Sequence, residues 1–237
     1  MDFNLNRLWA AVQTDLRLRL GDYLLPAAAF YFLPSLAVSL LVNVPPDAEL
    51  LDNPAIRWGG LTNIVAVMGT LAITIKSLSP EVPTGMAIRR AGKLFPAAFI
   101  LALLSGIATI IGIFALIVPG LIIAARLWLV IPVLIEERGR TIDIMKRSWA
   151  MTDGHTLKIL GLFAMLMIVV LLAGMPVVAL SALDGILGLG DPKIGDAGLL
   201  EAIAAGVVAS GTGILAAVFA AKAYEMLVGR PIADTFS

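Results

Sequence analysis

The chain contains no cysteine and a single histidine, His155. Without cysteine it forms no disulfide, thiolate metal site or thioether-linked haem, and it has no cysteine nucleophile. One histidine also argues against a histidine-based metal site within one chain. Charged residues make up only 14% of the 237 residues, and the formal net charge is zero. We therefore expect no metal, no cofactor and no nucleic-acid partner.

Apolar residues are abundant instead. They make up 59% of the chain, and the mean hydropathy is +0.96. A soluble domain of this length cannot bury so much apolar surface in one core, so lipid must surround most of the chain. The residues before the first long apolar stretch include Asp2, Asp15 and Asp22. This composition fits a secretory signal peptide poorly, so we interpret that stretch as a retained membrane span.

Six stretches approach the roughly 20 apolar residues that a helix needs to cross a bilayer. They lie at residues 23–44, 58–78, 94–117, 120–135, 157–183 and 199–224. We therefore predict an all-α polytopic membrane protein, with residues 1–237 forming a single membrane domain. The short fourth span must extend into the next polar stretch, thin the bilayer or form a re-entrant hairpin with the third. The sequence Val118, Pro119, Gly120 predicts a tight turn between these two spans.

Basic residues gather in alternate connections. The N-terminal segment, the second and fourth connections and the tail contain Arg7, Arg17, Arg19, Arg89, Arg90, Lys93, Arg138, Arg140, Lys146, Arg147, Lys158 and Arg230. The first and fifth connections are acidic. Because cytoplasmic loops are enriched in lysine and arginine, both termini are predicted to face the cytoplasm.

A basic, amphipathic stretch precedes each odd-numbered span. The apolar positions of the first and third copies are Leu5, Leu8, Trp9, Val12, Leu16, Ile142, Met145 and Trp149, and the weaker middle copy covers residues 86–93. This rhythm predicts three units, each an interfacial helix followed by a helical hairpin. Trp9 and Trp149 would then lie at the headgroup layer, with Arg7 and Arg147 toward anionic lipid phosphates. The simpler alternative is that these are the ordinary basic loops of a membrane protein.

Residues 117–158 resemble a known family. The resemblance rests on Pro119, Gly120, Arg126, Pro132, Glu136 or Glu137, Gly139, Lys146, Arg147, Ser148, Trp149, Thr152 and Gly154. In this pattern the chain is similar to the membrane domain of glycerophosphoryl diester phosphodiesterases and its stand-alone relatives. The resemblance implies a six-helix protein of the bacterial inner membrane. Fused members carry a soluble phosphodiesterase domain after the membrane part, whereas this chain ends at Ser237, so we expect no enzymatic half.

Arg126 is the most informative candidate, because a guanidinium inside a span costs at least ~2.5 kcal/mol and needs partners. No acidic residue lies deep in a predicted span. Arg126 is therefore expected to bind backbone carbonyls, Asn63, hydroxyls of other spans or a lipid phosphate. Either it ties the third and fourth spans together or it holds a lipid, and the structural tie is the simpler alternative.

The remaining charged candidates have ordinary explanations. Glu136 and Glu137 are placed to pair with Arg140 or Arg147. Lys76 and Lys222 lie near span ends and are expected to snorkel. Lys222 also has helical spacing to Glu225. The lone His155 is interpreted as a loop or cap residue.

Small residues recur every four positions along the last span: Ala202, Gly206, Ser210, Ala205, Ala209, Gly213 and Ala217. Such faces allow helices to approach closely. Tight packing within the monomer is the simpler interpretation, and a dimer interface is the alternative, so the oligomeric state stays open.

No motif for acyl transfer, metal hydrolysis or hydride transfer is present, and no nucleophile, acid and base share a depth. We therefore expect a non-catalytic protein that binds membrane lipids or a protein partner in envelope organisation or maintenance. A small transporter or channel is the alternative, and an intramembrane lipid-modifying enzyme is a third.

Overall fold

The computed structural model describes residues 4–42, 54–187 and 199–229. Within these ranges the regular elements are all helical. They are α1 (Leu5–Ala27), η1 (Ala28–Phe32), α2 (Leu33–Leu41), α3 (Pro54–Leu78), α4 (Thr84–Ala115), α5 (Ile117–Leu127), α6 (Val130–Glu137), α7 (Thr141–Met151), α8 (Thr156–Leu187) and α9 (Leu199–Val228). Six stretches of helix are long and apolar enough to cross a membrane, which confirms the prediction of an all-α polytopic membrane protein.

The N-terminal amphipathic stretch is not a separate helix. Asn4 caps α1, and its Oδ1 accepts hydrogen bonds from the backbone N–H groups of Asn6 and Arg7. From there the chain stays helical to Leu41 through a π-helical turn at Ala28–Phe32. Gly21 is too weak a breaker to end the helix before the predicted span at 23–44, so the amphipathic stretch and the apolar stretch form one continuous helix.

The other two amphipathic stretches differ from each other. Residues 86–93 form the first turns of α4 and continue directly into its apolar part. The third stretch does form its own helix, α7, which ends before a turn in which Gly154 has a φ of +74°. That left-handed conformation stops the helix. Only one of the three units therefore has a distinct helix before its hairpin.

The hairpin between the third and fourth spans turns two residues earlier than predicted. Leu116 alone separates α4 from α5, and Pro119 lies inside the first turn of α5, where its missing N–H does no harm. Close packing requires glycine here, because a Cβ on Gly112 would lie 2.8 Å from the Cα of Gly120. The fourth span then extends to Glu137 with an interruption between α5 and α6.

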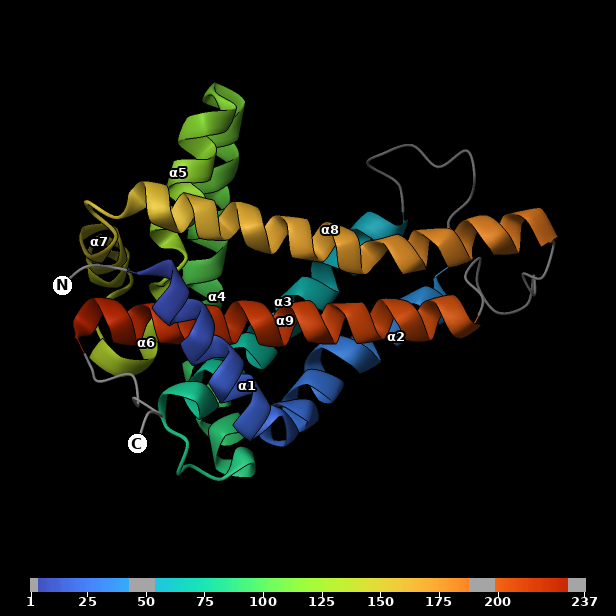
Figure 1. Cartoon of the computed structure of the whole chain (residues 1–237), viewed down its shortest axis with the longest axis horizontal. Coiled ribbons are helices and arrows are strands. Elements are labelled where there is room, and N and C mark those ends of the chain that lie inside the picture. The colour runs from blue at the N-terminus through green and yellow to red at the C-terminus, as the bar shows by residue number, and fades with distance from the viewer. Residues whose placement is uncertain (1–3, 43–53, 188–198, 230–237) are drawn as a thin grey trace.

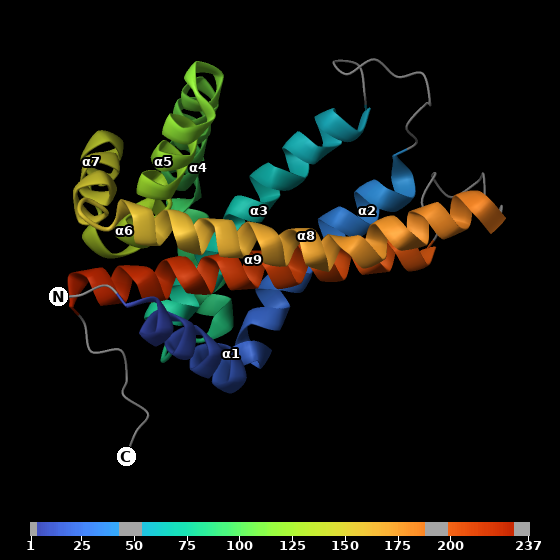
Figure 2. The same ribbon diagram turned by 45° about the horizontal axis from the view of Figure 1, so that its top comes forward.

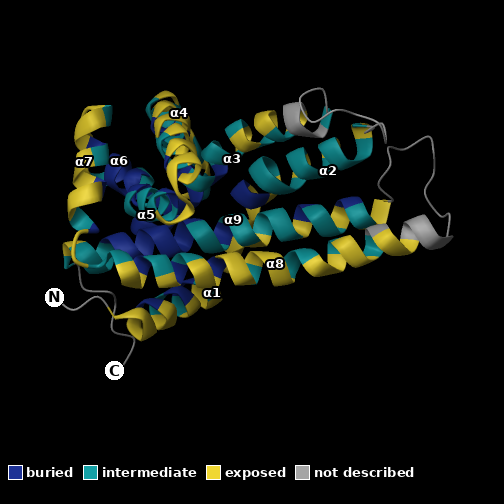
Figure 3. Ribbon diagram, turned by 90° about the horizontal axis from the view of Figure 1, so that it is seen from above, coloured by how far each residue is buried: buried dark blue, intermediate teal, exposed yellow. Residues whose placement is uncertain are grey.

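The helices are not all aligned. α8 and α9 run antiparallel and side by side, while the hairpin of α4 and α5 stands across them (Figures 1 and 2). The C-terminal half of α9 is the most buried stretch, whereas much of α4 and α8 is exposed (Figure 3). Exposed apolar helix surface of this kind is what lipid covers in a membrane protein.

Two aromatic residues of η1 explain the small residues of α9. The ring of Tyr31 fits between Gly69 of α3 and Gly213 of α9, where a Cβ would lie 2.5 and 2.6 Å from it. Phe32 packs against Gly206 in the same way, at 2.7 Å. The hydroxyl of Ser210 donates to the Gly206 carbonyl at 2.8 Å. Gly206 and Gly213 therefore serve packing within the monomer.

Replacing Gly213 by alanine should destabilise the protein, because the new methyl group would overlap the Tyr31 ring, which Gly69 blocks from moving. We expect a loss of about 1–3 kcal/mol, measured as a lower Tm of the purified protein in detergent. Gly211→Ala is the matched control, since a Cβ there meets nothing within 4 Å. Equal Tm values for the two variants would contradict this packing.

Candidate functional site

A buried carboxylate lies where α1, α3 and α9 meet. Asp15 is 5% exposed and accepts hydrogen bonds from Arg19 at 2.8 Å, from the Ser77 hydroxyl at 3.1 Å and from the Tyr23 hydroxyl. The Nζ of Lys222 lies 3.5 Å from Asp15 Oδ1, the same oxygen that accepts from Arg19. Residues far apart in the sequence thus share one ionic cluster.

Lys222 and Lys76 are both buried, so the expectation that they snorkel to water is wrong. Lys222 pairs with Glu225 at 3.0 Å, which confirms the predicted helix pair, and also with Asp15. Lys76 donates to the carbonyls of Pro80 and Val82, both at 2.9 Å. It also lies 3.3 Å from Asp22. Both ammonium groups have carboxylate and carbonyl partners because a bare buried charge would be costly.

Arg126 contacts α7 and the turn after it. Its guanidinium lies 3.1 Å from Asp153 and 4.7 Å from the centre of the Trp149 ring. Its backbone carbonyl accepts a hydrogen bond from Ser148 at 2.7 Å. Arg126 therefore ties α5 to α7 rather than the third span to the fourth. The expectation that Asn63 could bind Arg126 is wrong, since Asn63 lines a separate cavity of about 200 Å³ beside Tyr31.

The predicted ion pair at the end of the fourth span involves Glu137. Arg147 binds both oxygens of this carboxylate, at 3.0 and 3.1 Å. Tyr224 of α9 donates to the same carboxylate at 3.4 Å. Glu136 is half-buried beside it. α6, α7 and α9 are thereby joined next to Arg138.

The remaining predicted residues lie at the surface or in turns. Arg7 is exposed on α1, and the Trp9 ring lies 5.6 Å from that of Phe219. Trp149 is 40% exposed. His155 lies in the turn between α7 and α8, where its backbone N–H donates to the Thr152 carbonyl. The structure does not bring Arg7 and Trp9 together with Arg126 and Trp149.

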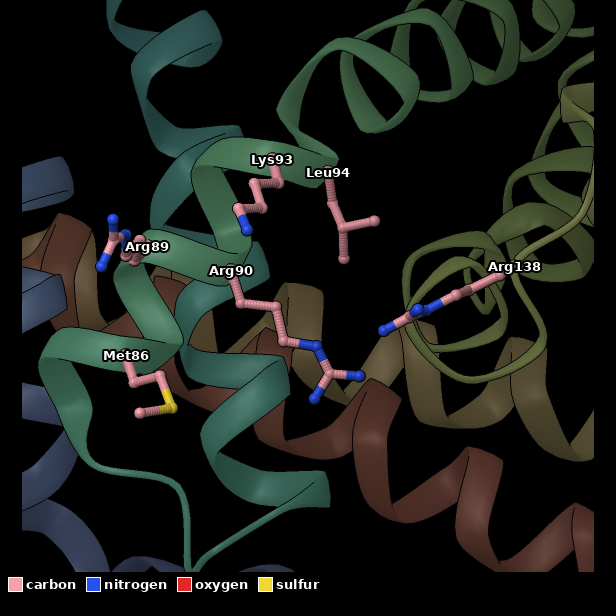
Figure 4. A pocket seen from close by; sticks show the side chains of 6 residues that line it. All are labelled: Met86, Arg89, Arg90, Lys93, Leu94 and Arg138. Carbon is pink, nitrogen blue, oxygen red and sulfur yellow. The ribbon is translucent and has the colours of Figure 1, made fainter.

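Sequence reasoning did not predict a cavity with a volume of about 430 Å³. Its lining is basic and apolar: Met86, Arg89, Arg90, Lys93, Leu94 and Arg138. Five of these residues come from the first turns of α4, and Arg138 follows α6. Figure 4 shows Arg90 and Arg138 extending toward each other from the two sides, while Arg89 points away from Arg138. We call this cavity the basic pocket.

The basic pocket contains four cations and no carboxylate. Arg90 Nε is buried and has no hydrogen-bond partner among the described residues. Arg138 adopts a left-handed conformation with a φ of 42°, which is unusual for a residue other than glycine. Backbone strain and an unsatisfied buried donor often mark places where a ligand binds.

No group of three or more potential ligating side chains is suited to a metal ion within the described ranges. The basic pocket is therefore the arrangement with the clearest chemistry, and that chemistry is anion binding. Sequence reasoning identified its residues only as separate members of basic stretches. The i, i+3 spacing of Arg90 and Lys93 was visible, but no local pattern indicates that α6 brings Arg138 to them.

Replacing Asp15 by asparagine should destabilise the fold, because buried Lys222 and half-buried Arg19 lose a charged partner. Glu225 still faces Lys222, so we expect about 3 kcal/mol, the lower end for breaking a buried pair. Chemical or thermal unfolding in detergent measures this loss.

Asp22→Asn is the matched control. Its carboxylate is 43% exposed, and Lys76 keeps both carbonyl partners, so the loss should stay below about 1 kcal/mol. If Asp15→Asn cost no more than Asp22→Asn, the ionic cluster would not be holding α1, α3 and α9 together.

Comparison with known proteins gives one match. Among curated proteins and among solved structures nothing matches. A family model, described as the membrane domain of glycerophosphoryl diester phosphodiesterase, matches residues 96–230. These residues include the whole of the 117–158 pattern, so the resemblance drawn from that pattern is confirmed. Since the match covers more than half of the 237 residues, the chain belongs to the family of the membrane domain of glycerophosphoryl diester phosphodiesterase.

Proposed function

We propose that this protein is a non-catalytic, multi-pass protein of the bacterial inner membrane that binds anionic lipid headgroups in the basic pocket. Through that binding it would help to organise or maintain the envelope. The basic pocket is the observation that carries the proposal. Its four cations face no carboxylate within the pocket, and an anionic phosphate supplies the missing charge.

The place of the basic pocket along α4 supports a lipid as the source of the phosphate. Arg89, Arg90 and Lys93 precede the long apolar part of the same helix, and Leu94 and Met86 line the pocket beside them. A phosphate held there leaves an attached acyl chain beside the apolar surface of α4. Cations at the end of a membrane helix are typical of headgroup contacts.

Several carboxylates of the described residues pair with cations outside the basic pocket. Asp15, Asp22 and Glu225 pair with Arg19, Lys76 and Lys222, while Glu137 and Asp153 pair with Arg147 and Arg126. Among the described residues, no carboxylate lines the basic pocket. An external anion is therefore the natural partner.

A small transporter is the second candidate, and the Asp15 cluster favours it. Buried charges within spans often line ion pathways. Asp15, however, is neutralised by Arg19 and Lys222 in the same cluster. Flux through liposomes containing the purified protein separates the two candidates, because a lipid-binding protein should give none.

Removing the charge of Arg90 should weaken lipid binding. We expect Arg90→Gln to retain at least about tenfold less phosphatidylglycerol than wild type after purification from nanodiscs of mixed phosphatidylglycerol and phosphatidylcholine, measured by native mass spectrometry. The loss of one charge-assisted hydrogen-bonding group, about 1.5–3 kcal/mol, sets that scale. Phosphatidylcholine retention should not change.

Arg17→Gln provides the control, because Arg17 is an exposed arginine of α1 outside the basic pocket. Wild-type retention of phosphatidylglycerol by Arg90→Gln, or an equal loss in Arg17→Gln, would contradict a specific site. In the second case the lipid would be held by general surface charge.

We also propose that the basic pocket faces the cytoplasm, as the positive-inside rule indicates. The chain has no cysteine, so single introduced thiols can be labelled without background. In intact spheroplasts, a membrane-impermeant maleimide should label Lys193→Cys but not Glu81→Cys, which lies between α3 and α4. The reverse pattern would contradict the orientation while leaving lipid binding itself open to the test above.

A further inference from the structure

The basic pocket carries more positive charge than an ordinary anionic phospholipid can balance. Four cations line it, and no carboxylate of the described residues does. A phosphodiester lipid such as phosphatidylglycerol brings a single negative charge. A phosphomonoester brings about −1.5 to −2 near neutral pH, and a diphosphate brings more.

The donors are arranged for a phosphate group with several free oxygens. Arg90 and Arg138 reach in from opposite sides (Figure 4). Each guanidinium is a planar fork that binds two oxygens of one phosphate. A phosphodiester has only two unesterified oxygens, so two opposed forks compete for them. A phosphomonoester offers three and a diphosphate more, so the two forks share at most one oxygen.

From this geometry we infer that the basic pocket selects a polyanionic phosphate, either a phosphomonoester or a diphosphate, over a phosphodiester. The inference rests on the proposed function and names the ligand class of that site. Arg90 and Arg138 bind the terminal oxygens, and Lys93 adds charge as a compact third donor. Met86 and Leu94 contact the first carbons of an attached chain.

Arg138 gives an unusually clean test, because its left-handed backbone suits glycine better than arginine. Arg138→Gly removes the guanidinium and relieves the backbone, so it should fold at least as stably as wild type. Loss of binding in this variant therefore reports the missing cation rather than unfolding. A Tm equal to or above that of wild type establishes this before binding is measured.

The experiment compares phosphatidic acid with phosphatidylglycerol carrying the same acyl chains, using the full chain in nanodiscs and native mass spectrometry. Wild type should prefer phosphatidic acid by roughly tenfold, the size of one well-made ionic contact. Arg138→Gly should abolish that preference, so that the two lipids bind about equally. Arg17→Gln should keep it. Adding inorganic diphosphate identifies the source of the polyanion: displacement of bound phosphatidic acid points to a soluble ligand, and persistence points to a lipid.

The outcomes separate this inference from the proposed function. Equal wild-type binding of the two lipids, with both weakened by Arg90→Gln and Arg138→Gly, overturns polyanion selectivity and leaves headgroup binding standing. Binding that none of the pocket variants alters overturns both. A tenfold preference that survives in Arg138→Gly also overturns the inference, because the opposed guanidinium would then contribute nothing.

Discussion

A charge inside hydrocarbon must have a partner, and the pair between Asp15 and Lys222 shows how this protein meets that constraint. The carboxylate comes from the first long helix and the ammonium from the last, so neutralising them brings the two ends of the fold together. Ser77 donates to the same carboxylate from α3. α9 is consequently fixed against α1 and α3, and its small residues accept the aromatic side chains of η1.

The ionic cluster also positions the elements that form the basic pocket. Lys76, next to Ser77, donates to the carbonyls of Pro80 and Val82 and so shapes the connection that begins α4. On the other side, Tyr224 of α9 contacts Glu137, the residue before Arg138. The two walls of the pocket are therefore attached to α3 and α9, which the ionic cluster holds together. Among the described residues, no carboxylate lines the pocket.

Much of the fold was predictable from the sequence, because hydropathy and charge segregation act over single helices. The number and order of apolar helices follow from runs of about 20 residues, and the Lys222 and Glu225 pair follows from helical spacing. The separate interfacial helix predicted before the first span is not present, because no strong breaker stands between Leu5 and Leu41. The turn at Leu116 was placed at Val118 because proline and glycine were interpreted as the turn itself.

The candidate site was less predictable, because it depends on contacts between distant segments. Asp15 was not recognised as a buried partner of Lys222, since the two lie on the first and last helices and share no local pattern. Arg138 and Arg90 also share no local pattern. They line one pocket because α6 places Arg138 beside the first turns of α4. The family match begins at residue 96, after the α4 residues of the pocket, and includes Arg138. The family pattern therefore contains only one wall of the pocket.

The central claim is that a phosphate group occupies the basic pocket between Arg90 and Arg138. An electron cryomicroscopy structure of the full chain in nanodiscs containing phosphatidic acid tests this claim most directly. The account predicts density for a phosphate within hydrogen-bonding distance of both guanidinium groups, continuous with acyl-chain density along α4. A well-ordered pocket that contains only water, or in which a protein carboxylate pairs with Arg138, would contradict it.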